Sequence, residues 1–241
     1  IKQIVFECPA GTTTAANEKT LHGAMLEIEK RIAAEQNSAL DPFYISSLSN
    51  STIVYKAMVK PSRLVDYYHD LKLFIDSGLK TRVAEFHQRF ATNAAPNWKL
   101  AHPYRKISHN GEINTIPSTA RDAAARTATY AEEGHRVIQT TGSDTAQLDT
   151  ILHVMLVNGW TPLQALRHLI PPALHPSQSQ TFQDYIQFTQ ALSSQADGPA
   201  AIVCTDGTQL AATADRNSLR PLNSTTIDNE VVIICSEAGC G

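Results

Sequence analysis

The residues of this sequence best suited to chemistry lie in a polar run with a glycine in its middle, SHNGEIN at positions 108–114. The more apolar residues 99–107 come before it and have the pattern of a strand, so the run is expected at a strand end. Asn110 offers a carboxamide donor, and Gly111 offers a backbone N–H that no side chain obstructs. Two adjacent neutral donors suit a developing oxyanion. An ordinary Asn-Gly turn accounts for the same two residues, and the run alone does not separate these interpretations.

Three further candidates lie at the edges of predicted elements. Arg89 closes a predicted strand over residues 82–90, beside Thr92. An arginine there could bind a carboxylate through two parallel hydrogen bonds, and the alternative is a solvated or ion-paired surface arginine. Asp144 lies at the predicted start of a helix, in the run GSDT at 142–145. It is either a helix N-cap or a carboxylate that receives a substrate ammonium group.

The fourth polar segment, residues 215–221 (DRNSLRP), is a dense charged turn between predicted strands. It is either an ion-paired loop or part of a site. Arg89 and Asp144 together would hold the α-carboxylate and α-ammonium groups of an amino acid, with Asn110 and Gly111 near its reacting carbonyl. This arrangement fits hydrolysis of the side-chain amide of glutamine, provided that a nucleophile is present.

Periodicity and turn signals predict the elements that must position these residues. Hairpins, rather than repeated βα crossovers, connect the strands, and the turn Asp206-Gly207 is a strong hairpin signal. We therefore predict an α+β fold of antiparallel sheets with helices packed outside, in one domain over residues 1–241. The predicted strands are 3–6, 43–48, 52–58, 82–90, 99–109, 199–205, 209–214 and 230–235, and the predicted helices are 17–36, 61–71, 117–130, 142–158, 161–169 and 181–193.

Composition excludes several classes of function. The 241 residues are 42% hydrophobic and 18% charged, with a formal net charge of -3. Without a basic stripe, nucleic acid is not an expected partner, and apolar runs no longer than a strand predict no membrane span. The four cysteines, Cys8, Cys204, Cys235 and Cys240, are too scattered for a zinc or iron–sulfur spacing, so no metal site is expected. Unpaired cysteines favour a reducing, cytoplasmic compartment.

Several longer motifs resemble, in the same order, the amidotransferase domain of the glutamate synthase large subunit. With a weaker likeness through residues 43–56 and back to 9–11, the resemblance covers nearly the whole chain. It implies a class II glutamine amidotransferase with an N-terminal-nucleophile hydrolase fold, a four-layer αββα sandwich of two antiparallel sheets between helices. The motifs are at residues 87–93, 96–105, 109–116, 142–145, 197–201, 215–221 and 236–239.

The resemblance also implies roles for the candidate residues. Arg89 binds the substrate carboxylate, Asp144 binds its ammonium group, Thr92 lines the same pocket, and the Asn110 side chain with the Gly111 N–H forms the oxyanion hole. The nucleophile in such enzymes is an N-terminal cysteine whose own α-amino group is the base. This domain needs no cofactor, whereas FMN and an iron–sulfur cluster belong to other domains of the parent family. The implied partners are glutamine or glutamate, and the synthase domains or a companion chain of the same enzyme.

The sequence departs from this family at three places. Position 1 is Ile1, which has no nucleophilic atom, and Cys8 is internal, in a segment that matches the later part of the family domain. We therefore expect a partial amidotransferase domain, incomplete at its N-terminus and without the catalytic cysteine. Ser218 stands where the family usually has glycine, and would strain a left-handed turn. Residues 117–120 (PSTA) replace a usual Gly-Asn-Arg run.

Three functional hypotheses follow. The first is the glutamine-hydrolysing, ammonia-releasing domain of a glutamate synthase-like enzyme, which supplies ammonia for glutamate synthesis. The second is a non-catalytic amidotransferase-like protein that binds a ligand or a protein partner. The third is an unrelated hydrolase with an internal nucleophile such as Cys8. Whether this chain is itself an enzyme stays open at this point, because the resemblance places the nucleophile outside it.

Overall fold

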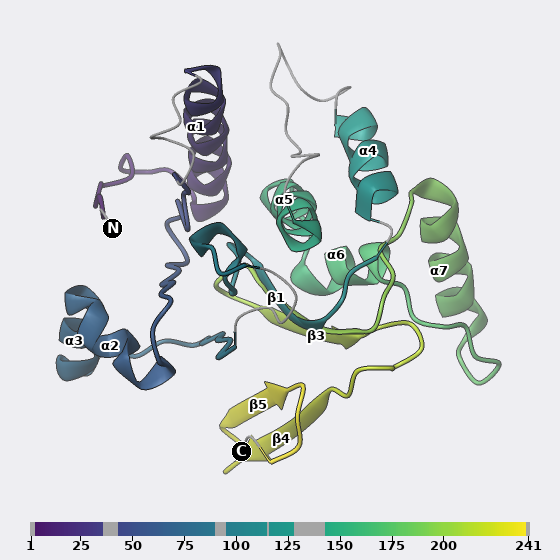
Figure 1. Ribbon diagram of the computed structural model, residues 1–241. Helices are drawn as coiled ribbons and strands as arrows, with labels where there is room; N and C mark the ends of the chain where they lie inside the picture. Colours follow the sequence, from purple (N-terminus) through teal and green to yellow (C-terminus); the bar gives the residue numbers. More distant parts are fainter. Residues whose placement is uncertain (1–2, 36–42, 90–94, 115, 128–142, 240–241) are drawn as a thin grey trace.

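The computed structural model describes residues 3–35, 43–89, 95–114, 116–127 and 143–239 (Figure 1). Helices and antiparallel strands share the fold, as predicted. Among the described residues, every helix is too short or too polar to cross a membrane. In chain order the elements are α1 (Thr14–Ala34), the 3-10 helix η2 (Pro61–Arg63), α2 (Leu64–Tyr67), α3 (His69–Asp76), the 3-10 helix η3 (Trp98–Leu100), β1 (Ile107–Gly111), α4 (Ile116–Thr127), α5 (Asp144–Val157), α6 (Pro162–Leu169), α7 (Gln180–Leu192), β2 (Ala200–Thr205), β3 (Leu210–Ala214), β4 (Asn223–Ile227) and β5 (Val231–Cys235).

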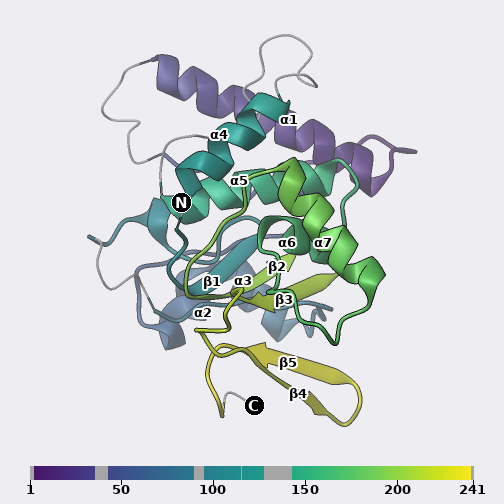
Figure 2. The ribbon, with the colours of Figure 1, turned by 90° about the vertical axis from the view of Figure 1, so that its right-hand side faces the viewer.

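The described strands form two antiparallel sheets. One has the order β1-β2-β3, and the other is the β4–β5 hairpin. In the first sheet Ile107 lies opposite Cys204, which in turn lies opposite Ala211. The turn at Asp206-Gly207 joins β2 to β3, as the sequence predicts. Figure 2 shows α1, α4, α5, α6 and α7 on one side of the three-stranded sheet and the β4–β5 hairpin on the other.

The hydrophobic core lies between the helix-facing side of the three-stranded sheet and helices α4, α5 and α6. Side chains alternate between the two faces of a strand, so every second residue of β1 and β2 points toward the helices. Burying each large aliphatic side chain contributes about 1.5–3 kcal/mol, which makes this layer the main stabilising contact. Its fully buried members include Ile107, Ile116, Leu148, Leu152, Leu166 and Ile202.

The helices that flank the core begin at the residues that their sequences favour. The Oγ of Ser143 accepts a backbone N–H in the first turn of α5 at 3.2 Å. Thr161 and Gln164 form a capping box at the start of α6, and Pro162 occupies its first position. The helices predicted over 17–36, 117–130, 142–158, 161–169 and 181–193 are confirmed close to their predicted bounds as α1, α4, α5, α6 and α7.

Several predicted strands are wrong. Residues 3–6, 43–48, 52–58 and 82–89 are described, but they form no strand. Alternation favours an extended backbone, whereas a strand also needs a neighbour to supply hydrogen bonds. The strand predicted over 99–109 shrinks to β1 because residues 98–100 form a 3-10 turn capped by the Asn97 side chain. The helix predicted over 61–71 extends to Asp76 with a break at Tyr68, and β4, which is polar, was not predicted.

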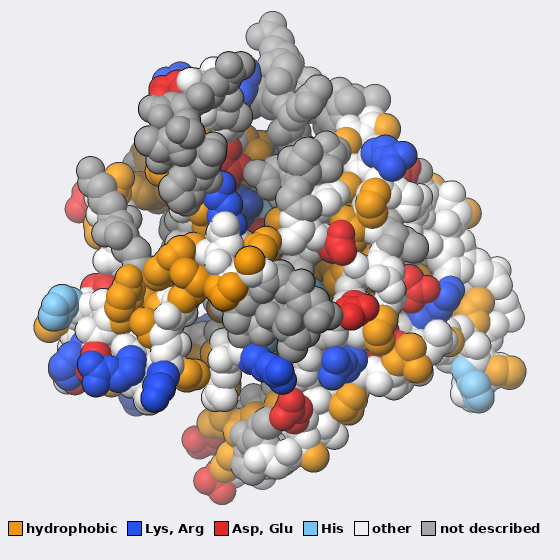
Figure 3. Space-filling view, viewed as in Figure 1, with side chains coloured by type: hydrophobic (Ala, Val, Ile, Leu, Met, Phe, Trp, Pro, Cys, Tyr) orange, Lys and Arg blue, Asp and Glu red, His pale blue; other side chains and the backbone are white. Residues whose placement is uncertain are grey.

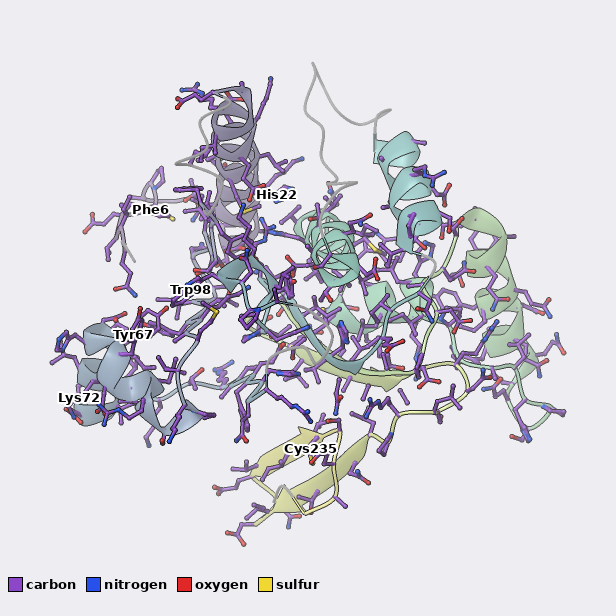
Figure 4. All side chains as sticks on the ribbon, viewed as in Figure 1. Phe6, His22, Tyr67, Lys72, Trp98 and Cys235 are labelled. Atoms are coloured by element: carbon purple, nitrogen blue, oxygen red, sulfur yellow. The ribbon has the colours of Figure 1, made fainter. Side chains whose placement is uncertain are left out.

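Hydrophobic side chains gather on the side of the molecule where α2 and α3 lie (Figure 3). Leu73 and Ile75 of α3 are 66% and 55% exposed. Tyr67 of α2 and Trp98 of η3, both labelled in Figure 4, lie with ring centroids 6.3 Å apart. Tyr68 anchors this region because its buried hydroxyl donates a hydrogen bond to the Lys56 carbonyl. Apolar surface is therefore left uncovered on this side of the described chain.

Candidate functional site

Asn110 and Gly111 end β1, which is an edge strand of the described three-stranded sheet. The Glu112 N–H donates to the Pro199 carbonyl at 3.1 Å. In an antiparallel ladder, hydrogen-bonded and non-hydrogen-bonded pairs alternate, so the Gly111–Ala200 pair is non-hydrogen-bonded. The Gly111 N–H therefore points away from β2, toward the side of β1 where the described sheet has no strand. It is a backbone donor on the edge of β1 that has no partner strand among the described residues.

Only glycine fits at position 111. Its φ is +122°, in a region that residues with side chains rarely adopt. A Cβ atom on Gly111 would lie 1.9 Å from the Pro199 carbonyl oxygen and 2.9 Å from the Cα of Ala200. These contacts are to backbone atoms of the paired strand, so they could not be relieved by a side-chain movement. The simple Asn-Gly hairpin turn is excluded, because residues 110 and 111 lie within a paired strand.

The Asn110 side chain lies on the face of the sheet opposite the helices. Ser108 shares this face with Asn110, whereas His109 and Ile107 point toward the helices. The Asn110 Nδ2 donates a hydrogen bond of 2.9 Å to the Oγ of Ser236, just after β5. The side-chain amide is partly buried there, between the sheet and the end of the hairpin.

A cluster of three histidines brings the Arg89 segment next to β1. The rings of His87 and His102 stack with centroids 4.8 Å apart, and His102 meets His109 edge-on, also at 4.8 Å. The backbone N–H of Arg89 donates to the Nδ1 of His87 at 3.3 Å. Because His109 precedes Asn110 directly, the histidine cluster connects the predicted carboxylate-binding segment to the strand with the two donors.

A second set of contacts brings the start of α5 to the same strand. The Nε2 of His109 lies 2.7 Å from the Oγ1 of Thr145. The Ser143 Oγ forms a 2.8 Å hydrogen bond with the Tyr104 hydroxyl. Asp144 lies between these two anchored residues, in the first turn of α5, where a carboxylate is favourable. The N-cap is Ser143, so the interpretation of Asp144 as the N-cap is wrong.

The side chains of Arg89 and Asp144 are both exposed. Neither side chain forms a hydrogen bond or an ion pair with another described residue. Thr92 was predicted to line the same pocket, and it lies outside the described residues, as does Gly142. The structure therefore brings three of the four candidate segments together, at 87–89, 109–111 and 143–145.

The histidines of the cluster are neutral near pH 7. Burial, followed by the charges of His109, His87 and Lys56, lowers the pKa of His102 to about 2. Burial and the neighbouring His87 lower the pKa of His109 to about 4. The pKa of His87 is also lowered, mainly by burial. The cluster is thus an uncharged scaffold, and the charges at this site come from Arg89 and Asp144.

A buried ion pair that no sequence pattern predicted fixes the approach to β1. Asp149 of α5 is fully buried, and it accepts hydrogen bonds from the Arg105 Nε at 3.1 Å and the Lys106 backbone N–H at 2.8 Å. Arg105 also lies 3.5 Å from Glu29 of α1. The signal in the sequence was an acidic residue within the apolar run of α5, next to Leu148.

The charged turn at residues 215–221 is held by its own acidic residue. The buried Asp215 carboxylate accepts three backbone N–H groups, and Arg216 pairs with Asp197 at 2.8 Å. Burial alone would raise the pKa of Asp215, but these hydrogen bonds hold it below its usual range. The ion-paired-loop interpretation is therefore supported. The three donors, at 3.0 Å each, are the N–H groups of Asn217, Leu219 and Arg220.

Comparison with known proteins gives a family match over the whole chain. The family described as "Glutamine amidotransferases class-II" matches residues 1–241. The chain is 36% identical over 234 residues to "Ferredoxin-dependent glutamate synthase" of Antithamnion sp., a match that covers 92% of this chain and 15% of that protein. It is 34% identical over 249 aligned positions to "Glutamate synthase [NADPH] large chain" of Azospirillum brasilense, covering 99% of this chain and 16% of that protein.

A third relative, "Glutamate synthase [NADH]" of Saccharomyces cerevisiae, is 35% identical over 206 residues, which cover 82% of this chain and 10% of that protein. The chain thus spans between 10% and 16% of the length of these three relatives.

Proposed function

Because the chain belongs to the class II glutamine amidotransferases, we propose that it forms the substrate-binding and oxyanion-stabilising part of a glutaminase. The reaction releases ammonia from glutamine, and a glutamate synthase-like enzyme uses this ammonia to make glutamate. The observation that carries the proposal is the pair of donors on β1. The Gly111 N–H, which points away from β2, lies next to the side-chain amide of Asn110. Their strand contacts the segments that carry Arg89 and Asp144.

In this proposal two opposite charges select an amino acid. The Arg89 guanidinium binds the α-carboxylate of glutamine, and the Asp144 carboxylate binds the α-ammonium group. Both side chains are exposed, and the neutral histidines between their segments offer no competing charge. Thr92 lines the same pocket. The amide of the bound glutamine then reaches β1, where Asn110 and Gly111 contact its carbonyl oxygen.

The two donors stabilise the negative charge that develops on that oxygen. A thiolate attacks the carboxamide carbon, the C–N bond breaks, and ammonia leaves with the proton that the base took from the thiol. Water then attacks the thioester, which releases glutamate and restores the thiol. A single oxyanion donor commonly contributes about 100- to 1,000-fold in turnover.

We propose that the nucleophile is an N-terminal cysteine outside these 241 residues, with its own α-amino group as the base. Cys204 does not suit this role, because it is fully buried and burial and nearby carboxylates raise the pKa of its thiol. Cys235 is half-buried, and its thiol donates to the Glu237 carbonyl at 2.9 Å. An internal nucleophile at Cys8 would have no free α-amino group beside it.

We further propose that the complete domain is a four-layer αββα sandwich, of which this chain is a part. The helical layer on one face of β1-β2-β3 supports one half of that arrangement. The glutaminase step needs no cofactor or metal in this domain, since the cysteine thiolate is the nucleophile. FMN and an iron–sulfur cluster belong to other domains. Its partners are those domains or a companion chain, in the cytoplasm, and nucleic acid and membranes are not among them.

The proposal is tested by measuring ammonia release from glutamine by the complete protein that contains this chain. Arg89→Ala and Asp144→Asn are each expected to raise KM for glutamine about tenfold to 100-fold, since each removes a charge-assisted hydrogen bond. Arg82→Ala and Asp184→Asn change exposed residues of the same types and should leave KM unchanged. Glutamine binding without ammonia release in the unsubstituted protein would instead establish the non-catalytic alternative. Equal KM values in all variants would remove Arg89 and Asp144 from the site.

A further inference from the structure

We propose that Ser236 is a positioning residue for the Asn110 amide, which it holds in the orientation that stabilises the oxyanion. This inference deepens the proposed function and rests on it. The Ser236 Oγ accepts a 2.9 Å hydrogen bond from the Asn110 Nδ2 across 126 positions of sequence. Ser236 opens the run SEAG at 236–239, a motif for which neither the substrate-binding groups nor the oxyanion donors give a use.

The chemistry of a primary amide explains why such a residue is needed. The terminal torsion of an asparagine side chain is broad and roughly two-fold, so the backbone alone does not fix which way the amide faces. One orientation presents a donor N–H to the oxyanion, and the opposite one presents the carbonyl oxygen Oδ1, which would repel it. The Nδ2 group carries two hydrogens. With one hydrogen donated to Ser236, the other is held in the amide plane and is free for the substrate.

Ser236 is itself held in place by its neighbours. The Cys235 Sγ donates to the Glu237 carbonyl at 2.9 Å, which closes a tight turn around Ser236. Cys235, labelled in Figure 4, ends β5 on the side of the hairpin that faces the three-stranded sheet. The Ser236 side chain is half-buried at this junction. The β4–β5 hairpin thus acts as a support that delivers one acceptor to the face of β1 opposite the helices (Figure 2).

The kinetic effect of losing Ser236 distinguishes a positioning role from that of a hydrogen bond that only stabilises the fold. A purely structural hydrogen bond would contribute to stability alone, so its loss would leave kcat unchanged. A positioning residue acts through the Asn110 amide, so its loss lowers kcat, leaves glutamine binding intact and has no further effect once that amide is gone.

The test uses the complete protein and measures kcat and KM for glutamine. Ser236→Ala is expected to lower kcat about tenfold to 100-fold with KM unchanged, since a misplaced catalytic group commonly costs that much. Ser236→Thr keeps the hydroxyl and should restore most of kcat. Ser224→Ala, on exposed β4, is the matched control and should match the wild type. If Ser236→Ala does not fold, Ser236→Cys provides the same test with a poor acceptor.

A double-mutant cycle decides between the two roles. In the Asn110→Ala background, Ser236→Ala should cause no further loss of kcat. A wild-type kcat for Ser236→Ala, or an equal loss in both backgrounds, would overturn the positioning role while leaving the proposed glutaminase intact. Failure of the unsubstituted protein to release ammonia would overturn the proposed function, and this inference with it.

Discussion

The Nε2 of His109 lies 2.7 Å from the Oγ1 of Thr145, and this contact joins the strand that carries Asn110 to the helix that carries Asp144. The two anchored residues are the immediate neighbours of the two proposed site residues. The proposed oxyanion donors and the carboxylate proposed to bind the ammonium group are therefore held by the same contact. This side-chain hydrogen bond helps to set their separation.

Thr145→Val should weaken the contact between β1 and α5 by removing the hydrogen bond to His109. Valine has nearly the shape of threonine, but it leaves the His109 Nε2 without its partner. Losing one hydrogen bond of this kind costs about 1 kcal/mol of stability. Because Asp144 shifts with its neighbour, KM for glutamine should rise several-fold, and urea unfolding with steady-state kinetics measures both effects. Thr145→Ser keeps the hydroxyl and should behave as the wild type. A valine variant with wild-type stability and KM would show that the contact does not set the geometry.

Asp149→Ala should be strongly destabilising. It leaves Arg105 buried without its 3.1 Å partner and removes the acceptor for the Lys106 N–H. Breaking a buried pair in this way costs about 3–5 kcal/mol. Urea unfolding of Asp149→Ala should be compared with Asp184→Ala, which changes an exposed residue of α7 and should cost less than about 0.5 kcal/mol. Similar losses in the two variants would mean that the buried pair is not a main support of β1.

The free energy of unfolding should fall as the pH drops below about 6.5. His153 of α5 is 2% exposed, and burial, followed by the charges of His22, Lys106 and Arg105, lowers its pKa to about 2. Between the two pKa values the unfolded chain binds a proton that the folded chain does not. Each such histidine therefore removes about 1.4 kcal/mol per pH unit. Glu85 has the opposite effect, because burial raises its pKa to about 7. Its contribution to the free energy of unfolding therefore increases as the pH falls from about 7 to 4.5.

Unfolding measured from pH 5 to pH 7.5 checks this expectation. His153→Leu should make the slope of unfolding free energy against pH shallower by about 1.4 kcal/mol per unit below pH 6.5. Identical slopes in the wild type and His153→Leu would show that His153 is not held neutral.

Ser218→Gly should stabilise the protein. Ser218 has a φ of +52°, so the turn adopts the left-handed conformation for which the family glycine is suited. Relieving that strain should contribute about 0.5–1 kcal/mol, after allowing for the greater freedom of glycine in the unfolded chain. Thermal or urea unfolding measures the change. Ser224→Gly, in strand β4, should instead destabilise, and a loss of stability in both variants would contradict the argument.

Local patterns in the sequence correctly predicted those features of the fold that depend on a few neighbouring residues. Helices α5 and α6 begin close to the predicted residues, Asp206-Gly207 turns a hairpin, and Ser218 takes the backbone conformation expected of a family glycine. The position of Asn110 and Gly111 at the end of a strand was likewise predicted correctly. These features depend on a few consecutive residues, so periodicity and residue type reveal them.

The features of the fold and site that were not predicted depend on contacts between residues far apart in the sequence. The bond from Asn110 to Ser236 joins residues 126 positions apart, and no local pattern announces it. The histidine cluster collects His87, His102 and His109 from three separate segments. Residues 52–58 are rich in strand-forming residue types, yet no partner strand pairs with them in the described chain. Strand propensity measures how well a side chain packs on a sheet, and whether a sheet is present depends on the tertiary structure.

The central claim is that Asn110 stabilises the oxyanion, and ammonia release by Asn110→Ala in the complete protein tests it most directly. The variant should lose about 100-fold or more in kcat, with KM for glutamine close to that of the wild type. Asn223→Ala, an exposed asparagine of β4, is the matched control. A kcat for Asn110→Ala equal to that of the wild type would contradict the oxyanion assignment.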